Sequence, residues 1–496
     1  MQDIAQYLED RTLILLSNRE PYEHRHVDGR VETRQPPGGL VSALDPTMRA
    51  THGTWVAWGS GSADAETCDS DGRLMVPPAD PAYSLRRVFL DGAEVDGYYL
   101  GFSNAALWPL CHMLVQHFEY RDDYWHRYRD VNEKFARAVA AEVDRAEKRP
   151  VVWIQDYHFA LAAELIRSRS NPVLIHQFWH IPFPPSDILR LLPMDVNDSL
   201  LRGMLGNDLI GFQTERYALN FLGCVSEFIK DADTDPNNLV IHYSGRSIEI
   251  GVFPISIDVE KYEQLACEPE SVTRVERLRG RHAQGGRQVG LSVDRVDYTK
   301  GIPERLRALT QLWEQHPEML ERFTMLVVAT PSRSELASYR DLEHEMVSTV
   351  REINDRFRTE SWEPIVLVNE NVSAEVLAGA YRAADICLVS SLQDGMNLVA
   401  KEFVACQVDE RGVLVLSRFT GAAEVIDGAI LINPFNIDGF VEGIQRALEM
   451  SEDERHARMC RMRTQLRGWT IFDWLASILS RTCDIIGARM EAPSEA

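Results

Sequence analysis

Short runs of apolar, often β-branched residues recur along the chain, and longer segments with helically spaced apolar residues separate them. Such runs, bounded by turn residues, are typical of buried parallel strands, and the longer segments are typical of the helices that connect them. The pattern therefore predicts parallel α/β units. In the first half of the chain, the predicted strands are 12–18, 151–154, 173–178 and 209–212.

The second half repeats the pattern, with predicted strands at 289–293, 324–329, 365–368, 386–390, 413–417 and 430–432. Each series is long enough for a doubly wound sheet, and 496 residues exceed what one hydrophobic core usually holds. We therefore predict an α/β protein with two Rossmann-like domains, residues 1–258 and 259–468, which face a central cleft.

The predicted boundary follows residues 254–258, which we interpret as a strand and which the charged stretch 270–287 follows. Near the C-terminal end, residues 469–490 carry apolar side chains at helical spacing. We expect the segment 469–496 to contain an amphipathic helix that packs back on the first domain.

Composition and charge narrow the class of protein. Apolar residues make up 45% of the chain and charged residues 26%, as in folded globular proteins. The 52 basic and 75 acidic residues give a net charge of −23, which argues against nucleic acid as the main partner. A local basic pocket is still compatible with this charge.

The sequence shows no targeting segment and no metal-binding pattern. The N-terminal stretch lacks the features of a signal peptide, and no window approaches the roughly 18 consecutive apolar residues of a membrane span. The eight cysteines are scattered, without a CxxC pair or a Cys/His cluster at metal-ligand spacing. We expect reduced thiols, no metal, no membrane partner and a cytoplasmic location.

The motif DGMNLVAKE follows the predicted strand 386–390 and enters a helix. Gly395 allows close approach of the backbone to a ligand, and the amides of residues 397–399 can cap a diphosphate. Asp394 can accept hydrogen bonds from sugar hydroxyls, and Glu402 lies where a ribose could bind. The alternative is an ordinary turn with a solvated aspartate, which the eight-residue spacing of the two acids disfavours.

A second motif, DRVDYTKG, follows the predicted strand 289–293. Arg295 and Lys300 are two cations five residues apart that can bind a leaving diphosphate, one as a planar fork and one as a point charge. The alternative is a set of surface ion pairs with Asp294 and Asp297.

Polar residues also end the predicted strands of the first half. Asp156 follows the strand 151–154, and His180 follows the strand 173–178. A single histidine beside aromatic residues is more often a core residue than a catalytic one. Two polar groups at the ends of neighbouring strands favour a shared ligand site, because such strand ends meet at one edge of a sheet.

Arg19 and Arg333 are two further strand-end arginines, each suited to a phosphate on a second substrate, although either alone is more simply a surface charge. A glycine loop at 35–40 precedes a predicted helix. The first strand is not followed by G-x-G-x-x-G, which argues against a dinucleotide-dependent hydride transfer.

The chain resembles glycosyltransferase family 20 from Leu13 to about Trp474. Ten motifs occur in the family's order, which is far more specific than any one of them. They are SNR, GGL, GYYLGFSNAALWP, WIQDYH, HIPFP, DLIGFQTE, DRVDYTKGIPER, ATPSR, DGMNLVAKE and TGAAEV.

The resemblance implies a GT-B fold and retaining transfer of glucose from a nucleoside diphosphate, with no required metal or other cofactor. The leaving phosphate itself takes the acceptor's proton in such enzymes, and cations stabilise the departing diphosphate. By position, the implied catalytic residues are Asp156, His180, Arg295, Lys300 and Asp394.

The same resemblance implies which residues contact each substrate, with His180 near the reacting face of the donor sugar. Gly39 and Trp58 are implied to line a loop that closes over the site. The implied donor contacts are Gly39, Arg295, Lys300, Asp394, Gly395, Met396, Asn397, Leu398, Val399 and Glu402. The implied acceptor contacts are Arg19, Trp58, Tyr99, Trp108, Asp156 and Arg333.

One departure bears on the acceptor. Residues 20–22, Glu-Pro-Tyr after Arg19, look more like the branch of glucosylglycerol-phosphate synthases, which accept glycerol 3-phosphate. GGL, GFSNAALWP and TPSR resemble the trehalose-6-phosphate synthase branch, which accepts glucose 6-phosphate and which we favour. The sequence leaves open whether the donor carries UDP, ADP or GDP, and whether the chain forms a homo-oligomer.

Two other classes fit the fold less well. A non-catalytic sugar-phosphate sensor would not need the intact charged set, and a nucleotide-sugar epimerase would have no use for the spare arginines and the glycine loop. No D-x-D-x-T phosphatase motif occurs, so we expect a separate phosphatase to act on the product.

Overall fold

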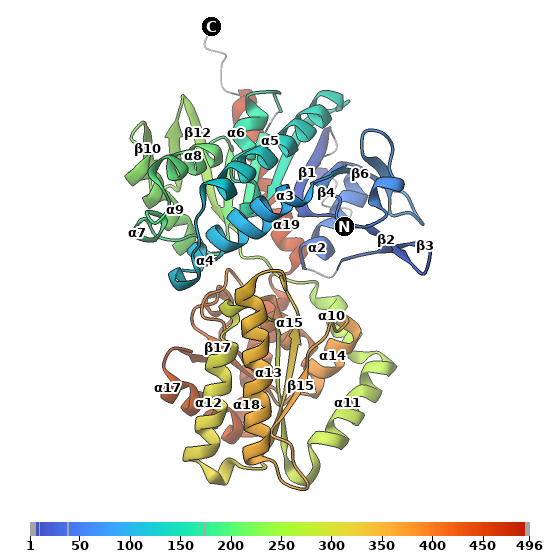
Figure 1. Cartoon of the computed structure of the whole chain (residues 1–496), viewed down its shortest axis with the longest axis vertical. Helices are drawn as coiled ribbons and strands as arrows, with labels where there is room; N and C mark the ends of the chain where they lie inside the picture. Colours follow the sequence, from blue (N-terminus) through green and yellow to red (C-terminus); the bar gives the residue numbers. More distant parts are fainter. Residues whose placement is uncertain (1–5, 9, 37–38, 173, 492–496) are drawn as a thin grey trace. The chain divides into compact units, whose positions relative to one another are not determined.

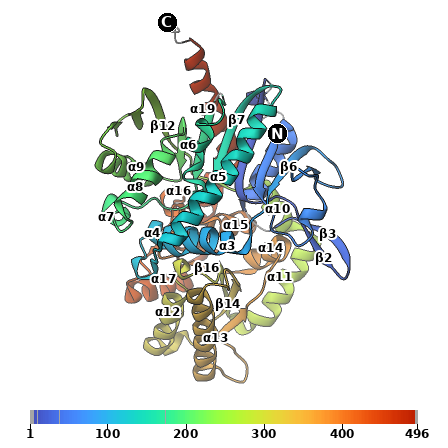
Figure 2. The ribbon, with the colours of Figure 1, turned by 45° about the horizontal axis from the view of Figure 1, so that its top comes forward.

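The computed structural model describes residues 6–8, 10–36, 39–172 and 174–491. The chain divides into two compact units: unit 1 comprises Met1–Pro254 and Phe472–Ala496, and unit 2 comprises Ile255–Ile471. Each unit is built around one large, mainly parallel sheet that helices cover (Figures 1 and 2).

The described part of unit 1 contains a ten-stranded sheet with the order β10-β11-β12-β9-β8-β7-β1-β4-β6-β5 and a separate hairpin, β2–β3. Strands β6-β4-β1-β7-β8-β9-β12 run parallel, and β5, β10 and β11 extend the two edges in antiparallel register. The strands are β1 (Arg11–Arg19), β2 (Glu23–Val27), β3 (Arg30–Arg34), β4 (Thr54–Trp58), β5 (Arg73–Val76), β6 (Tyr83–Val88), β7 (Arg149–Gln155), β8 (Leu174–Trp179), β9 (Leu209–Phe212), β10 (Ala232–Asp235), β11 (Val240–Tyr243) and β12 (Arg246–Val252).

The unit 1 helices include one thirteen-residue π-helix, η3, a rare form that is frequent at functional sites. The α-helices and η3 are α2 (Gly39–Thr51), α3 (Gly92–Glu94), η3 (Val95–Leu107), α4 (Trp108–Cys111), α5 (Asp122–Arg145), α6 (Ala162–Arg167), α7 (Ser186–Leu189), α8 (Met194–Met204), α9 (Glu215–Phe228) and α19 (Ile471–Glu491). Short 3₁₀ turns are η1 (Gln6–Leu8), η2 (Asp64–Glu66), η4 (Val115–His117) and η5 (Tyr157–Phe159).

Helix α19 buries its apolar stripe on the middle strands of unit 1. Ile485 and Ile486 share a buried cluster with Val151, Leu174 and Leu209, the starts of β7, β8 and β9. The Trp474 ring lies 5.8 Å from the Trp153 ring. Burying each such side chain contributes about 1.5–3 kcal/mol, so this helix is part of the core of unit 1.

Unit 2 has a six-stranded, all-parallel sheet of order β15-β14-β13-β16-β17-β18 among its described residues. Numbered along the unit, this is the 3-2-1-4-5-6 order of a dinucleotide-binding Rossmann fold. The strands are β13 (Gln288–Arg295), β14 (Phe323–Thr330), β15 (Ile365–Val368), β16 (Ile386–Val389), β17 (Val413–Ser417) and β18 (Ile430–Ile432).

The unit 2 helices start at recognisable caps: the side chain of Asn436 accepts from Gly439 N before α17, and that of Ser451 accepts from Glu454 N before α18. The helices are α10 (Val259–Cys267), α11 (Pro269–His282), α12 (Ile302–Gln315), α13 (Ala337–Phe357), α14 (Ala374–Ala383), α15 (Leu398–Cys406), α16 (Ala422–Val425), α17 (Ile437–Glu449) and α18 (Glu452–Arg467). The 3₁₀ turns are η6 (Gln284–Gly286), η7 (Tyr298–Lys300) and η8 (Pro317–Met319).

Each predicted strand of the two series overlaps an observed strand, and 209–212, 365–368, 413–417 and 430–432 match residue for residue; Val173 lies outside the described residues. The strand predicted at 254–258 is wrong. β12 ends at Val252, and residues 253–258 have no regular structure where the chain passes from unit 1 to unit 2. The apolar residues that suggested a strand there, Ile255 and Ile257, are buried without pairing in a sheet.

Candidate active site

The switch point of the unit 2 sheet lies between β13 and β16, which are neighbours in the sheet although two strands separate them along the chain. Ligands of open α/β sheets bind outside the carboxyl ends of such a strand pair. Both motifs predicted for the donor follow these strands: Arg295 ends β13, and the turn 390–397 follows β16.

Lys300 and Asp394 are brought together at this point. Lys300 Nζ donates to Asp394 Oδ2 at 2.6 Å, and the two side chains are 13% and 15% exposed. The same oxygen accepts from Asn397 Nδ2 at 3.1 Å and from Ser391 Oγ at 3.3 Å. Asp394 is therefore held in one orientation by three donors from two loops, the kind of fixed geometry that substrate binding requires.

The turn before α15 is shaped by side chain and backbone contacts. Asn397 has a φ of 87° and caps α15 by accepting from Ala400 N at 3.0 Å. Ala422 N donates to Met396 O at 2.7 Å, which ties this turn to the start of α16. The first amides of a helix have no partner within it, so the residues that open α15 present donors to an anion.

Arg295 and Arg333 both face the buried carboxylate of Asp297. Arg333 Nη1 lies 3.2 Å from Asp297 Oδ2, and Arg295 Nη2 lies 3.7 Å from the same oxygen. Burial alone would raise the pKa of Asp297, but Arg333, Arg295 and Lys300 outweigh it and lower the pKa to about 2. A carboxylate that stays ionised fixes both arginines near the end of β13.

A second carboxylate of the same motif points inward. Asp294 Oδ2 pairs with Arg305 Nη1 at 2.8 Å, and the Arg305 side chain is 1% exposed. Burial raises the pKa of Asp294, and the charge of Arg305 opposes that rise. Asp294 and Asp297 are thus buried carboxylates that pair with arginines beside the candidate donor site. The alternative of solvated surface pairs is wrong for these two residues.

Glu402 lies on α15 between two tyrosine hydroxyls. Tyr262 OH donates to Oε1 at 3.0 Å and Tyr381 OH donates to Oε2 at 2.8 Å. Burial raises the pKa of Glu402, and the two hydroxyls lower it. Each carboxylate oxygen retains a second lone pair, so this arrangement is compatible with acceptance from a ribose hydroxyl.

The switch point of unit 1 lies between β1 and β7, and predicted site residues end both strands. Arg19 ends β1 and is in register with Trp58 at the end of β4. The Trp58 ring lies 5.7 Å from the ring of Tyr99, which η3 carries. Arg19, Trp58 and Tyr99 therefore gather at one edge of the sheet.

Asp156 and His180 follow β7 and β8 and contact each other. Asp156 Oδ1 accepts from His180 N at 3.2 Å, and Asp156 has a φ of 67°, a strained conformation for a residue other than glycine. His180 Nε2 lies 2.8 Å from Gln155 Oε1, and burial lowers the pKa of His180 to about 3. His180 is therefore a neutral imidazole at physiological pH.

Trp108 and Gly39 lie at element starts in unit 1. Trp108 is the first residue of α4, and its ring lies 5.9 Å from that of Tyr157, which directly follows Asp156. Gly39 begins α2, while Pro37 and Gly38 of the predicted glycine loop lie outside the described residues. Arg333, the remaining predicted acceptor residue, belongs to unit 2.

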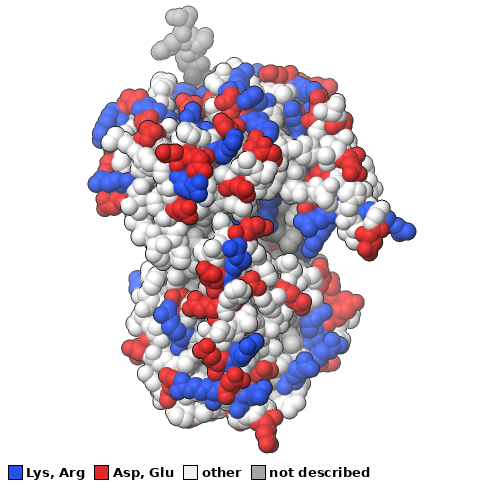
Figure 3. All heavy atoms as spheres, in the orientation of Figure 1, with Lys and Arg blue, Asp and Glu red and all other residues white. Residues whose placement is uncertain are grey.

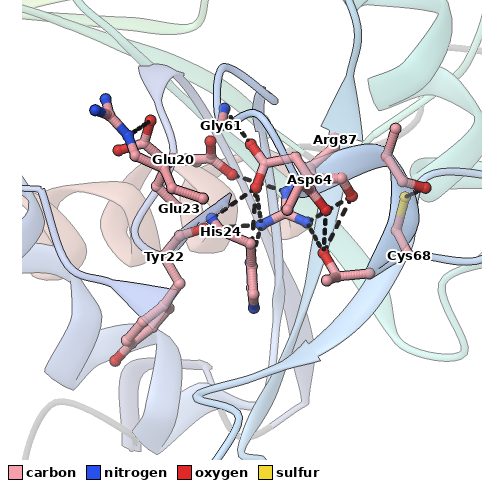
Figure 4. Close-up of polar contacts among 12 residues, drawn as sticks. Glu20, Tyr22, Glu23, His24, Gly61, Asp64, Cys68 and Arg87 are labelled. Atoms are coloured by element: carbon pink, nitrogen blue, oxygen red, sulfur yellow. Dashed lines mark hydrogen bonds and ion pairs between the residues drawn. The ribbon is translucent and has the colours of Figure 1, made fainter. Parts of the chain in front are cut away.

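A buried ionic network, which the sequence did not reveal, supports the segment after Arg19 (Figure 4). Arg87 donates from Nε to Glu20 Oε2 at 2.8 Å, and its Nη2 lies 2.8 Å from Asp64 Oδ1 and 2.7 Å from His24 Nδ1. The side chains of Arg87, Glu20 and Asp64 are at most 1% exposed. Burial and the hydrogen bond with Asp64 raise the pKa of Glu20 to about 9, which favours its protonated form at neutral pH.

The Glu20→Gln variant is expected to lose part of the pH dependence of stability. The folded protein keeps a proton on Glu20 that the unfolded chain releases above its ordinary value of 4.5. Glu20 therefore lowers the free energy of unfolding as pH rises from about 4.5 to about 9, by up to about 1.4 kcal/mol per pH unit. Urea unfolding at several pH values in this window should show that the free energy of unfolding declines less steeply with pH in the variant than in wild type.

Exposed Glu66, which pairs with His26, provides the control for loss of a carboxylate, and Glu66→Gln should follow the wild-type pH profile. Equal slopes for Glu20→Gln and wild type would contradict a proton held on Glu20.

Comparison with known proteins identifies the family. The profile of glycosyltransferase family 20 matches residues 11–483. The chain belongs to this family. The fold and the resemblance predicted from the ten motifs are thereby confirmed, and the two sheets are those of a GT-B glycosyltransferase.

Three relatives of this glycosyltransferase family show the extent of the similarity. A bifunctional trehalose-6-phosphate synthase/phosphatase of Thermoproteus tenax is 36% identical over 488 residues, which cover 97% of this chain and 64% of the relative's own length. The structure of the trehalose-6-phosphate enzyme from E. coli bound with UDP-2-fluoro glucose has a TM-score of 0.83 at 30% identity, covering 96% of this chain and 99% of that chain. A UDP-forming α,α-trehalose-phosphate synthase from Burkholderia xenovorans in complex with glucose-6-phosphate has a TM-score of 0.81 at 32% identity. The match covers 95% of this chain and 100% of that chain.

The surface of this family 20 glycosyltransferase carries mixed charge. Acidic and basic side chains are interspersed over the visible face of each unit (Figure 3). Among the described helices, none has the length and the hydropathy that a bilayer crossing requires.

Proposed function

We propose that this chain transfers glucose from UDP-glucose to glucose 6-phosphate, with retention of configuration, and forms α,α-trehalose 6-phosphate. The observation that carries the proposal is the convergence of Lys300, Asp394 and the start of α15 at the unit 2 switch point. Support comes from the E. coli relative bound with UDP-2-fluoro glucose and from the B. xenovorans relative in complex with glucose-6-phosphate.

Unit 2 binds the donor in this proposal. Arg295 and Lys300 bind the diphosphate, together with amides of residues 396–399 and the backbone at Gly395, where no side chain hinders close approach. Asp394 accepts from hydroxyls of the donor glucose, and Glu402 accepts from the ribose. Three donors already orient Asp394, so little entropy is lost when the sugar binds.

Unit 1 binds the acceptor. Arg19 provides charge for its phosphate, and Trp58, Tyr99 and Trp108 contact the sugar ring. Arg333 stays a predicted phosphate contact that rests on its sequence motif alone. Asp156 accepts from the ring hydroxyls, and Gly39, the first residue of α2, stays a predicted donor contact.

The chemistry needs no protein nucleophile. The bond from the anomeric carbon of glucose to the UDP oxygen breaks, and a bond to the acceptor's anomeric hydroxyl forms on the same face. The hydroxyl proton passes to the phosphate oxygen that leaves. Arg295 and Lys300 stabilise the negative charge that develops there, which is generally the largest contribution to such catalysis.

His180 contacts the donor sugar as a neutral imidazole. Its partly buried ring holds no charge near physiological pH, because desolvation lowers its pKa to about 3. It therefore binds sugar hydroxyls without repelling the positive charge that develops on the glucose ring.

The test is product identification. The full chain, incubated with glucose 6-phosphate and either UDP-, ADP- or GDP-glucose, should release the nucleotide and form a disaccharide phosphate with two α-anomeric signals by NMR. We expect UDP-glucose to be the best donor. A β-anomeric product, or release of free glucose alone, would contradict the proposal.

Activity is expected to persist in excess EDTA, because cationic side chains take the place that a metal holds in other transferases. Initial rates with and without the chelator, after prolonged dialysis, measure this. A loss that Mg²⁺ or Mn²⁺ restores would show that the leaving group requires a metal.

We also propose a cytoplasmic location and a separate phosphatase for the product. All eight cysteines are free thiols, as is usual in reducing compartments. The name of the T. tenax relative combines synthase and phosphatase, which supports a phosphatase as the next enzyme.

A further inference from the structure

Three side chains with metal-ligating atoms meet on unit 2, away from the strand ends that form the candidate active site. His456 and Cys460 lie one turn apart on α18, and Glu410 lies in the turn between α15 and β17. Residues four apart on a helix share one face, so both side chains of α18 can reach the same point. Sequence spacing alone did not indicate this cluster, because Glu410 is far from His456 and Cys460 along the chain.

The distances within the cluster are close to those of a metal site. Cys460 Sγ lies 3.0 Å from Glu410 Oε2, and His456 Nδ1 lies 3.3 Å from the same oxygen. Cys460 Sγ lies 3.9 Å from His456 Nδ1. Around a tetrahedral zinc ion, such atoms are about 3.4–3.6 Å apart, given bond lengths of about 2.0–2.3 Å. Small side chain rotations would therefore suffice.

The donor set selects the kind of ion. Thiolate and imidazole are ligands of zinc and of later transition metals, whereas magnesium and calcium prefer oxygen ligands alone. The thiolate and carboxylate would together neutralise a divalent ion. Three protein ligands leave one position for water.

A buried arginine orients the carboxylate. Arg463 Nε lies 3.6 Å from Glu410 Oε1, and the Arg463 side chain is only 4% exposed. Its guanidinium also pairs with Glu263 at 2.9 Å and donates to Ala405 O at 2.7 Å. Glu410 Oε1 therefore faces Arg463, and Oε2 faces Cys460 and His456. In metal sites, residues around the ligands commonly orient a carboxylate in this way.

We propose that Glu410, His456 and Cys460 bind one Zn²⁺, which ties α18 to the turn after α15. On binding, the Cys460 thiol releases its proton to solvent as the zinc–sulfur bond forms, and the hydrogen bond from that thiol to Glu410 is replaced. The role is structural: the ion cross-links two segments of unit 2 and leaves the transfer reaction unchanged.

Zinc titration of the full chain, freed of metal by dialysis against a chelator, tests the site. Competition with a chromophoric chelator should show that one equivalent of Zn²⁺ binds per chain. Cys460→Ser or His456→Ala should weaken the affinity for Zn²⁺ at least tenfold. Affinity should fall with falling pH, since protons compete for the sulfur and the imidazole. Wild type should show a higher Tm with zinc, whereas the variants should not.

Matched controls are Cys267→Ser, at an exposed cysteine of α10, and His316→Ala, at a histidine paired with Glu318. Both should bind zinc as wild type does. Co²⁺ should give a thiolate charge-transfer band that disappears in Cys460→Ser and is retained in Cys267→Ser.

Equal affinity in wild type and Cys460→Ser would overturn the proposal, and so would a cobalt complex without the thiolate band. Glu410→Gln provides a second variant if Cys460→Ser fails to fold, as judged by circular dichroism. Trehalose 6-phosphate formation should be the same with and without zinc, so the result is independent of the proposed function.

Discussion

The Lys300→Ala variant is expected to lower kcat/KM by about 10²–10³, the usual effect of removing one preorganised group that stabilises developing charge. Lys300 Nζ donates to Asp394 Oδ2 at 2.6 Å, and Lys300 follows the strand whose last residue is Arg295. Steady-state rates of UDP release measure the loss. Arg295→Ala should act in the same direction, since Arg295 and Lys300 share the leaving group.

The fold should survive both changes. The backbone oxygen of Lys300 accepts from Ser390 Oγ at 3.0 Å, a contact that does not depend on the lysine side chain. Exposed Lys261 of α10, in the same unit, provides the matched control, and Lys261→Ala should retain wild-type rates. Wild-type turnover in folded Lys300→Ala would disprove its assignment to the diphosphate.

Glucose 6-phosphate should be used at least a hundredfold better than glycerol 3-phosphate. A site that hydrogen-bonds several ring hydroxyls leaves buried polar groups unpaired when a three-carbon acceptor binds, at a cost of about 1–3 kcal/mol each. Two such losses together lower kcat/KM for glycerol 3-phosphate about a hundredfold relative to glucose 6-phosphate. The ratio of kcat/KM for the two acceptors, with a common donor, measures the preference.

The structure removes one objection to this preference. The Glu20 and Tyr22 side chains, which belong to the segment that resembles the glucosylglycerol-phosphate branch, are engaged inside unit 1. Glu20 pairs with Arg87, and Tyr22 OH donates to Asp45 Oδ1 at 3.0 Å. A ratio that favoured glycerol 3-phosphate would assign the chain to the glucosylglycerol-phosphate branch instead.

Local sequence determined the elements of this protein. Buried parallel strands need continuous apolar runs, and the fully buried strands β9 and β17 could be predicted to the residue for that reason. The strand ends then indicated Lys300, Asp394, Asp156 and His180, because polar groups after buried strands meet at one edge of a sheet.

Only the tertiary structure decided the partners of these residues. Surface ion pairs are the alternative that the sequence leaves open for Asp294 and Asp297. Both carboxylates are instead buried, and they pair with Arg305 and Arg333 from other segments. The same holds for Glu20, whose partners Asp64 and Arg87 lie far along the chain and carry no local signal.

Pairing between distant segments also explains why sequence spacing did not indicate the Glu410 cluster. Sequence spacing can indicate ligands that lie on one helix, such as His456 and Cys460, but Glu410 reaches them only because α18 packs near the turn after α15. The sequence by itself thus fixed the strands, the order of motifs and the family resemblance, since these depend on local apolar pattern. Tertiary packing alone brings together the side chains of three features: the network around Arg87, the buried Asp294 and Asp297, and the Glu410 cluster. The reason is that charged groups are buried only where partners from other elements compensate them.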